Sequence, residues 1–201
     1  MIIGLDIDNV IADFNNGLIN AYLEHDKKLR GNGIVNNKAK HIRFGLFDWS
    51  KKEEEAFYNN NIQKIVENLN VISGAKEYID KLKEDGHRII LITGRDNGEY
   101  SNPKEMTKNW LVKNNIYYDK LILTDAYAGG KFSKTAECIK YNIDVMVDDS
   151  RNVCRELYEA GIKVLIMDTR LNREITNIER VYNWEEIYNK IRGMNDEANS
   201  R

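Results

Sequence analysis

The first apolar segment of the chain, residues 1–10, contains two acidic residues, Asp6 and Asp8, with a single residue between them. The segment is too short to cross a membrane and is rich in β-branched residues, as in a buried strand. Acids are costly inside a protein core, so a strand ending in Asp-x-Asp would carry its carboxylates to the edge of a sheet. There they could bind a divalent metal, form a covalent phosphoryl intermediate, or do both. Helix capping by Asp8 or Asn9 is the alternative.

Polar side chains also follow two later apolar segments. They form two short clusters, Thr93-Gly94-Arg95 and Asp148-Asp149-Ser150. Because ligands of parallel sheets bind beyond the carboxyl ends of the strands, we expect these clusters to meet the first acid pair there. Four carboxylates are more negative charge than one small site holds unaided, which favours Mg²⁺ with its preference for hard oxygen ligands. Thr93 and a lysine, Lys131 or Lys134, would supply the phosphate contacts that acids cannot make.

Each cluster also has a purely structural interpretation. The Thr-Gly-Arg cluster could be an ordinary strand exit with a glycine turn, and the Asp-Asp-Ser cluster could cap the helix that follows it. Both lysines could be solvated surface residues. Because both acid pairs follow apolar, strand-like segments, a joint site is favoured over helix capping for Asp6 and Asp8.

A parallel sheet is needed to bring these residues together. Strands are predicted at 1–7, 88–93, 120–124, 143–147 and 163–167, with helices at 75–85, 103–115, 133–141 and 152–160. Most of the strands are unbroken apolar runs, which is typical of strands covered on both faces. The alternation of strand and helix predicts an α/β fold with a doubly wound parallel sheet.

About sixty residues after the first strand contain no clear parallel strand. Two predicted helices, at 14–29 and 51–69, flank a turn rich in glycine and asparagine and an aromatic stretch. The segment predicts a small helical cap, residues 14–71, inserted into a core of residues 1–13 and 72–201. We interpret the aromatic side chains mainly as the core of this cap, with base stacking as the alternative. The polar tail from residue 193 is predicted to fray.

Composition limits the classes of partner. The chain has 201 residues and a formal net charge of −2, so a nucleic acid polymer is not expected as a partner. No apolar stretch approaches the roughly 20 residues that span a bilayer, and no secretory signal is visible, so no membrane partner is expected. Cys138 and Cys154 form neither a C-x-x-C pair nor a disulfide framework, which predicts a cytoplasmic protein with reduced thiols. The oligomeric state is left open.

The order of the motifs resembles the haloacid dehalogenase-like (HAD) superfamily of phosphohydrolases. Four motifs are recognisable in order: Asp6-Ile7-Asp8-Asn9-Val10, Thr93-Gly94-Arg95, a lysine, and Val147-Asp148-Asp149-Ser150. The resemblance covers nearly the whole chain and implies a Rossmann-like core. The inserted segment is similar to the cap with which these enzymes select substrates. A Gly-Ala pair before the helix at 75–85, the short chain and the Val-Asp-Asp motif are similar to the 5'(3')-deoxyribonucleotidase branch.

The resemblance implies catalytic roles for four residues. Asp6 would be the nucleophile that accepts the phosphoryl group as an aspartyl phosphate. Asp8 would protonate the leaving alkoxide and then deprotonate the water that hydrolyses the intermediate. Thr93 would donate a hydrogen bond to a phosphoryl oxygen. Lys134, our first choice over Lys131, would offset the charge on Asp6 and the phosphate.

The resemblance also implies binding roles. Mg²⁺ would be held by the first acid pair, with Asp8 acting through its backbone carbonyl, and by the second acid pair: Asp6, Asp8, Asp148 and Asp149. Substrate contacts would come from the second motif and the second lysine: Thr93, Gly94, Arg95 and Lys131. Asp149 is predicted to be a direct metal ligand, and Asp148 a ligand either directly or through water.

The identity of Asp8 also separates reaction types within the superfamily. Its dehalogenases lack an acid at this position and its transport ATPases have threonine there, whereas an acid fits hydrolysis of an alkyl phosphate. The resemblance therefore implies a Mg²⁺-dependent phosphomonoesterase whose substrate is a small phosphorylated metabolite. A nucleotide is the first hypothesis, and a sugar phosphate or another small metabolite is the second.

Two hypotheses of another class are weighed against an enzyme. A phospho-receiver signalling domain also combines acids, a hydroxyl and a lysine around Mg²⁺, but its lysine comes last, whereas here Lys131 and Lys134 precede the late acid pair. A catalytically silent binding or scaffold protein is disfavoured because the acids are intact. Dinucleotide-binding and P-loop interpretations fail because G-x-G-x-x-G after the first strand and G-x-x-x-x-G-K-[ST] are absent.

Overall fold

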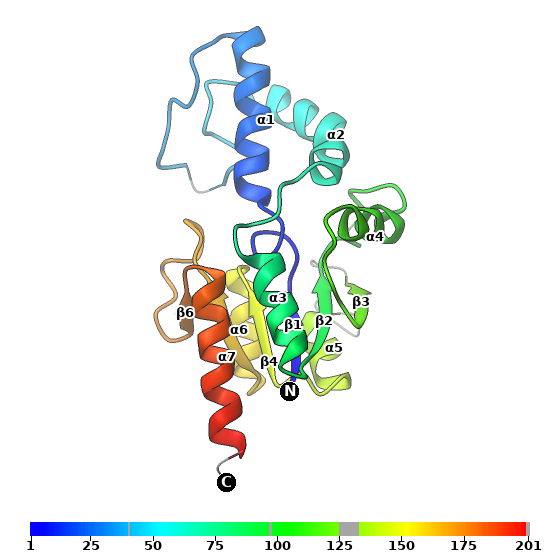
Figure 1. Cartoon of the computed structure of the whole chain (residues 1–201). Helices are drawn as coiled ribbons and strands as arrows, with labels where there is room; N and C mark the ends of the chain where they lie inside the picture. The colour runs from blue at the N-terminus through cyan, green and yellow to red at the C-terminus, as the bar shows by residue number, and fades with distance from the viewer. Residues whose placement is uncertain (40, 97, 125–132, 200–201) are drawn as a thin grey trace.

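A six-stranded parallel sheet forms the centre of the computed structural model, which describes residues 1–39, 41–96, 98–124 and 133–199 (Figure 1). The strands are β1 (Ile2–Leu5), β2 (Arg88–Thr93), β3 (Lys120–Leu123), β4 (Val145–Asp148), β5 (Lys163–Met167) and β6 (Glu179–Val181). They lie in the order β3-β2-β1-β4-β5-β6, and every neighbouring pair is parallel. The predicted doubly wound α/β fold is confirmed.

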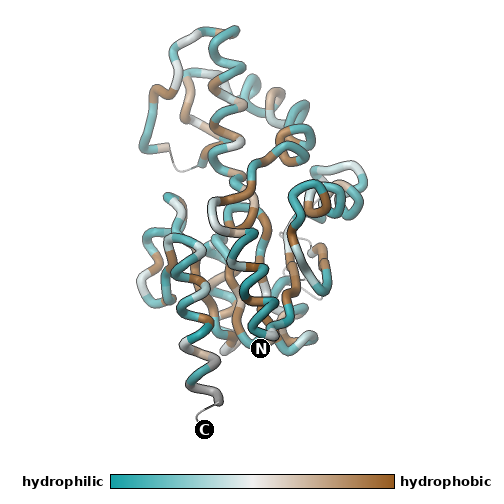
Figure 2. Tube along the Cα trace, viewed as in Figure 1, coloured by the Kyte–Doolittle hydropathy of each residue, from teal (hydrophilic) through white to brown (hydrophobic). Residues whose placement is uncertain are grey.

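Helices cover both faces of this sheet. The core helices are α3 (Ala75–Glu84), α4 (Pro103–Lys113), α5 (Lys134–Lys140), α6 (Arg151–Glu159) and α7 (Trp184–Asn199). Alternate residues of a strand point to opposite faces. In β2, Ile89 and Leu91 therefore join the cluster under α3 and α7, whereas Ile90 and Ile92 join the cluster under α5 and α6. Figure 2 shows the hydrophobic positions gathered along the strands and hydrophilic ones along the outer side of α3.

Two elements at the end of the chain were missed by the sequence prediction. Strand β6 has only three residues, two of them charged, so no apolar segment announced it. Helix α7 buries Trp184, Ile187 and Ile191, whose spacing of three to four residues is that of a helix face. The prediction that the tail frays from residue 193 was wrong as far as residue 199, because α7 continues to Asn199.

The inserted segment forms two helices beyond the carboxyl ends of the strands, α1 (Phe14–Leu29) and α2 (Lys51–Glu67) (Figure 1). Its entry and exit are paired, because the backbone amide of Asp13 donates to the carbonyl of Asn70 at 2.9 Å. In its interior the Tyr22 ring stacks on Trp49 at 5.1 Å between centroids, and the Trp49 indole donates to Asp26 at 2.7 Å. Among the described residues, no helix is both long and apolar enough to cross a bilayer.

Close contact between strands constrains Gly4 in the middle of β1. A Cβ atom there would lie 2.6 Å from Met146 Sδ and 3.1 Å from Ile143 Cγ2. Met146 is fully buried, so it has little room to move. We expect Gly4→Ala to lower the free energy of unfolding by about 1–3 kcal/mol through overpacking. Urea unfolding measures the loss.

Gly193→Ala is the matched control for this substitution. Gly193 lies in α7, and a Cβ atom there meets no atom within 4 Å. Alanine is favoured over glycine in a helix, so we expect an unchanged or slightly raised free energy of unfolding. Equal stability losses in the two variants would contradict the packing account of Gly4.

Candidate active site

Two neighbouring strands, β1 and β4, deliver acidic residues to the carboxyl edge of the sheet. Asp6 follows β1 directly, and its backbone amide donates to the carbonyl of Val147 at 2.9 Å, which continues the pairing of the strands. Asp148 is the last residue of β4. The pairing places the two acids side by side, and both are buried.

Lys134 joins these two acids. Its Nζ atom lies 2.8 Å from Asp6 Oδ1 and 2.6 Å from Asp148 Oδ2. The lysine is the first residue of α5, and the hydroxyl of Ser133 caps that helix by accepting from the amide of Ala136 at 3.1 Å. Of the two candidate lysines, Lys134 is therefore the one brought to the acids, while Lys131 lies outside the described residues.

Three carboxylates gather around this lysine. Oxygen atoms of Asp6, Asp148 and Asp149 all lie within 4.8 Å of one another. Asp148 Oδ1 also accepts from the backbone amide of Ser150 at 2.8 Å, so both oxygens of Asp148 have hydrogen-bond donors. A set of hard oxygen donors at this spacing fits Mg²⁺.

Burial and repulsion between neighbouring carboxylates shift the pKa values of the acids in this cluster. Burial raises the pKa of Asp6 to about 7, with Lys134 opposing the shift and Asp148 adding to it. Burial also raises the pKa of Asp149 well above its usual range, and the neighbouring carboxylates add to this shift. For Lys134, burial lowers the pKa, but attraction to Asp148 and Asp6 outweighs it and leaves the pKa raised. One ammonium thus faces three carboxylates, and a divalent cation would offset the negative charge that Lys134 does not neutralise.

Asp8 is not part of this group of three carboxylates, and its side chain pairs with an arginine. Arg95 Nε lies 2.9 Å from Asp8 Oδ2 and its Nη2 lies 2.6 Å from Oδ1, a two-pronged pair. The guanidinium is buried, with the residue 2% exposed, and its carbon lies 5.8 Å from the centroid of the Trp110 ring. Arg95 is predicted from the sequence to contact the substrate, and the structure places its guanidinium on the carboxylate of Asp8.

Thr93 and Gly94 lie at the end of β2. Thr93 is buried, and its hydroxyl is without a hydrogen-bond partner among the described residues. Its carbonyl accepts from the amide of Thr124 at 2.8 Å, which fixes the strand end. Leaving a buried hydroxyl unpaired is costly, so a ligand oxygen is a natural partner for it. Gly94 follows and is partly exposed.

Two asparagines extend the site beyond the residues predicted from the motifs. Asn9 has a left-handed backbone, with φ of 61°, a conformation that asparagine tolerates. Its Nδ2 donates to Asp149 Oδ2 at 3.0 Å, and its Oδ1 accepts from the amide of Asn15 at the start of α1. Asn172 donates to the carbonyl of Asp149 at 2.8 Å. Asn9 stood inside the first motif, but nothing in the sequence pointed to Asn172.

Known proteins similar to this chain are described as nucleotidases or as haloacid dehalogenase-like hydrolases. The family described as "5' nucleotidase, deoxy (Pyrimidine), cytosolic type C protein" matches residues 1–196. A nucleotidase of Clostridium acetobutylicum is 30% identical over 139 residues, 68% of this chain and 67% of that protein. A Chlorobaculum tepidum protein assigned as a 5'(3')-deoxyribonucleotidase is 22% identical over 96% of this chain and 91% of its own length. The structure of a haloacid dehalogenase-like hydrolase from Streptococcus pneumoniae is 16% identical and has a TM-score of 0.61, covering 94% of this chain and 97% of that one.

Proposed function

The chain belongs to the 5' nucleotidase, deoxy (pyrimidine), cytosolic type C protein family, and we propose that it is a Mg²⁺-dependent 5'-nucleotidase that forms an aspartyl phosphate on Asp6. Membership makes it a phosphoric monoester hydrolase and confirms the resemblance to HAD phosphohydrolases predicted from the motifs. The observation that carries the finer proposal is the buried contact of Lys134 with both Asp6 and Asp148.

In the proposed first step, Asp6 attacks the phosphorus atom. A bond forms between its carboxylate oxygen and phosphorus, and the bond from phosphorus to the ester oxygen breaks. Asp8 gives a proton to the departing alkoxide. Lys134 offsets the charge that gathers around the phosphoryl group, and Thr93 donates its unpaired hydroxyl to a phosphoryl oxygen.

In the proposed second step, water attacks the phosphorus of the aspartyl phosphate. Asp8 takes a proton from this water, the acyl phosphate bond breaks, and Asp6 returns as a free carboxylate with release of inorganic phosphate. Asp6, Asp148 and Asp149 would hold Mg²⁺, and the ion supplies positive charge to the phosphoryl oxygens when bound.

A nucleotide is the proposed substrate because the family and both relatives are named for nucleotidase activity. A sugar phosphate or another small metabolite is the second hypothesis, because the residues that carry the proposal act on the phosphoryl group, which all these substrates share. A cytoplasmic location is part of the proposal and rests on Cys138 and Cys154, which are buried and free.

A panel of phosphomonoesters with and without Mg²⁺ tests this proposal. It contains the 5'- and 3'-deoxynucleotides, 5'-ribonucleotides, sugar phosphates and p-nitrophenyl phosphate. We expect the highest kcat/KM on a 5'-deoxynucleotide, loss of activity on chelation and recovery with added Mg²⁺. A higher kcat/KM on a sugar phosphate would support the second hypothesis, and an inert panel would favour a binding or scaffold protein.

The contact between Arg95 and Asp8 gives a more specific prediction. Arg95→Lys keeps the positive charge but cannot make the two-pronged pair. We expect kcat on a deoxynucleotide to fall about 10- to 100-fold, part of the roughly 10²–10⁴ that general acid–base catalysis contributes. Where departure of the leaving group limits the rate, the loss on p-nitrophenyl phosphate should be smaller, because its leaving group needs little protonation. Steady-state kinetics on the two substrates measures the difference.

Arg173→Lys is the matched control, because Arg173 is exposed and pairs with Asp168 away from Asp8. Its kinetics should equal those of the wild-type protein. Wild-type kcat on the deoxynucleotide in a folded Arg95 variant would contradict the role of Arg95 in positioning Asp8.

A further inference from the structure

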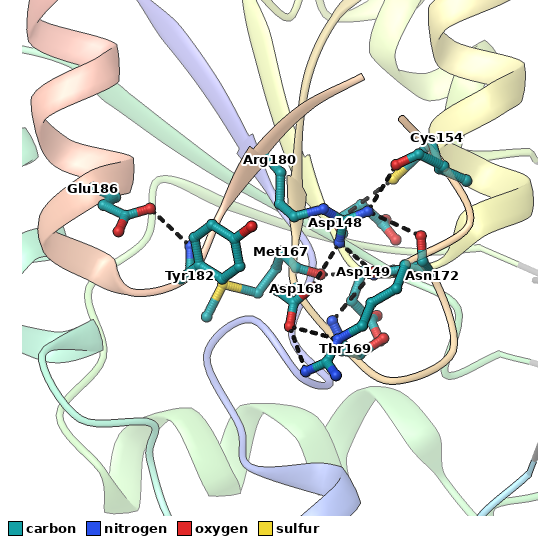
Figure 3. Close-up of polar contacts among 12 residues, drawn as sticks. Asp148, Asp149, Cys154, Met167, Asp168, Thr169, Asn172, Arg180, Tyr182 and Glu186 are labelled. Carbon is teal, nitrogen blue, oxygen red and sulfur yellow. Dashed lines mark hydrogen bonds and ion pairs between the residues drawn. The ribbon is translucent and has the colours of Figure 1, made fainter. Parts of the chain in front are cut away.

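Asn172 lies in the loop between β5 and β6 and is completely buried (Figure 3). Its Nδ2 atom donates to the carbonyls of Asp149 at 2.8 Å and Met167 at 2.7 Å. Its Oδ1 atom accepts from Arg180 Nη1 at 2.6 Å and from the amide of Thr169 at 3.2 Å. Both donors and both acceptor positions of the amide are therefore used.

This bonding pattern fixes the orientation of the Asn172 amide. A flipped amide would place its NH₂ group against two donors, Arg180 and the amide of Thr169, and its oxygen against two carbonyls. Arg180, on the neighbouring strand β6, also donates to the backbone carbonyls of Asn172 and Ile175 at 2.9 and 2.8 Å. These hydrogen bonds join the loop and the strand next to Asp148 and Asp149 (Figure 3).

Asp149 is consequently held both at its backbone and at its side chain. Asn172 fixes its backbone carbonyl, and Asn9 donates to its carboxylate at 3.0 Å. Its backbone follows the end of β4 and precedes α6, where the sheet pairing no longer holds it. Functional carboxylates need placement within roughly 0.5 Å, which requires supporting contacts of this kind.

We propose that Asn172 is a positioning residue that orients Asp149 for binding a divalent cation. The inference rests on the magnesium site of the proposed function. Asn172 itself does not touch the cation or the substrate, and it acts through the peptide unit of Asp149. Removal of such an outer contact typically lowers metal affinity about 10- to 100-fold.

Asn172→Ser and Asn172→Asp test the proposal by two routes. Serine is too short to reach the carbonyl of Asp149, whereas aspartate keeps the shape and the acceptor for Arg180 but replaces the donor with an oxygen. Arg173→Gln is the matched control, because Arg173 belongs to the same loop, is exposed and pairs with Asp168 instead of Asp149. Mn²⁺ binding is measured directly by electron paramagnetic resonance on folded protein, with urea unfolding in the absence of metal as the second readout.

We expect the Kd for Mn²⁺ to rise about tenfold or more in both Asn172 variants and by less than about twofold in Arg173→Gln. If the serine variant does not fold, the isosteric aspartate variant decides. Wild-type affinity in a folded Asn172 variant would overturn the proposal, as would an equal loss in the Arg173 variant. Wild-type protein that binds no Mn²⁺ would overturn it too. The two proposals can fail separately. If the wild-type protein binds Mn²⁺ but hydrolyses no phosphomonoester, the proposed function is rejected. Weaker Mn²⁺ binding in the Asn172 variants would then still support this inference.

Discussion

Asp6→Asn is expected to abolish phosphomonoester hydrolysis while leaving the fold intact. The amide of asparagine has nearly the shape of the carboxylate and can still accept from Lys134, but it cannot attack phosphorus. Loss of a covalent nucleophile removes about 10⁴-fold or more of kcat. Because burial raises the pKa of Asp6 to about 7, the neutral amide should be tolerated at least as well as the carboxylate. Initial rates and thermal unfolding measure the two effects.

Asp144→Asn is the control for this variant. Asp144 lies at the opposite, amino end of the strands, where it accepts from the backbone amide of Ile2 at 2.6 Å. Its kcat/KM should equal that of the wild-type protein. Mg²⁺-dependent turnover above a hundredth of the wild-type rate in the Asp6 variant would contradict the assignment of Asp6 as nucleophile.

Lys134→Met is expected to lower both the stability of the protein and its activity. It leaves Asp6 and Asp148 buried without their cationic partner, and breaking a buried ion pair costs about 3–5 kcal/mol. The kcat should fall about 100-fold or more, because the negative charge on the transferring phosphoryl group is no longer stabilised by the Lys134 ammonium. Added Mg²⁺ should recover part of the lost stability, since it supplies positive charge to the same carboxylates. Urea unfolding with and without Mg²⁺ measures this recovery.

Lys140→Met provides the comparison on the same helix. The Lys140 side chain is 60% exposed and lies 3.1 Å from a carboxylate oxygen of Glu137, whose own side chain is 8% exposed. Because the Lys140 end of this pair is in solvent, we expect its removal to lower the free energy of unfolding by about 1 kcal/mol, less than the removal of Lys134. A Lys134 variant as stable as the Lys140 variant in metal-free buffer would refute the view that Lys134 neutralises the buried acids.

Sheet periodicity explains why much of the fold and the positions of several site residues could be predicted. Asp6 and Asp148 follow apolar strands, and parallel pairing forces the ends of such strands to one edge. Lys134 could be predicted only as one of two candidates, because the start of α5 depends on the cap formed by Ser133. Strand β6 escaped prediction because three residues carry too little pattern to be recognised.

Contacts between distant side chains account for what the sequence did not reveal. Asp8 and Arg95 are 87 positions apart, and their pairing depends on the placement of a buried arginine side chain against a partly exposed aspartate. Asn172 reaches Asp149 across 23 positions from a loop with no recognisable motif. Such contacts follow from packing in three dimensions, whereas periodicity and motif spacing report only on local structure and strand order.

The stereochemical course of hydrolysis tests the covalent role of Asp6 most directly. A 5'-deoxynucleoside thiophosphate made chiral at phosphorus with ¹⁸O is hydrolysed in H₂¹⁷O, and the configuration of the released thiophosphate is determined. Attack by Asp6 followed by attack of water inverts phosphorus twice, so the account predicts net retention. Net inversion would show a single displacement by water and would contradict an aspartyl phosphate on Asp6.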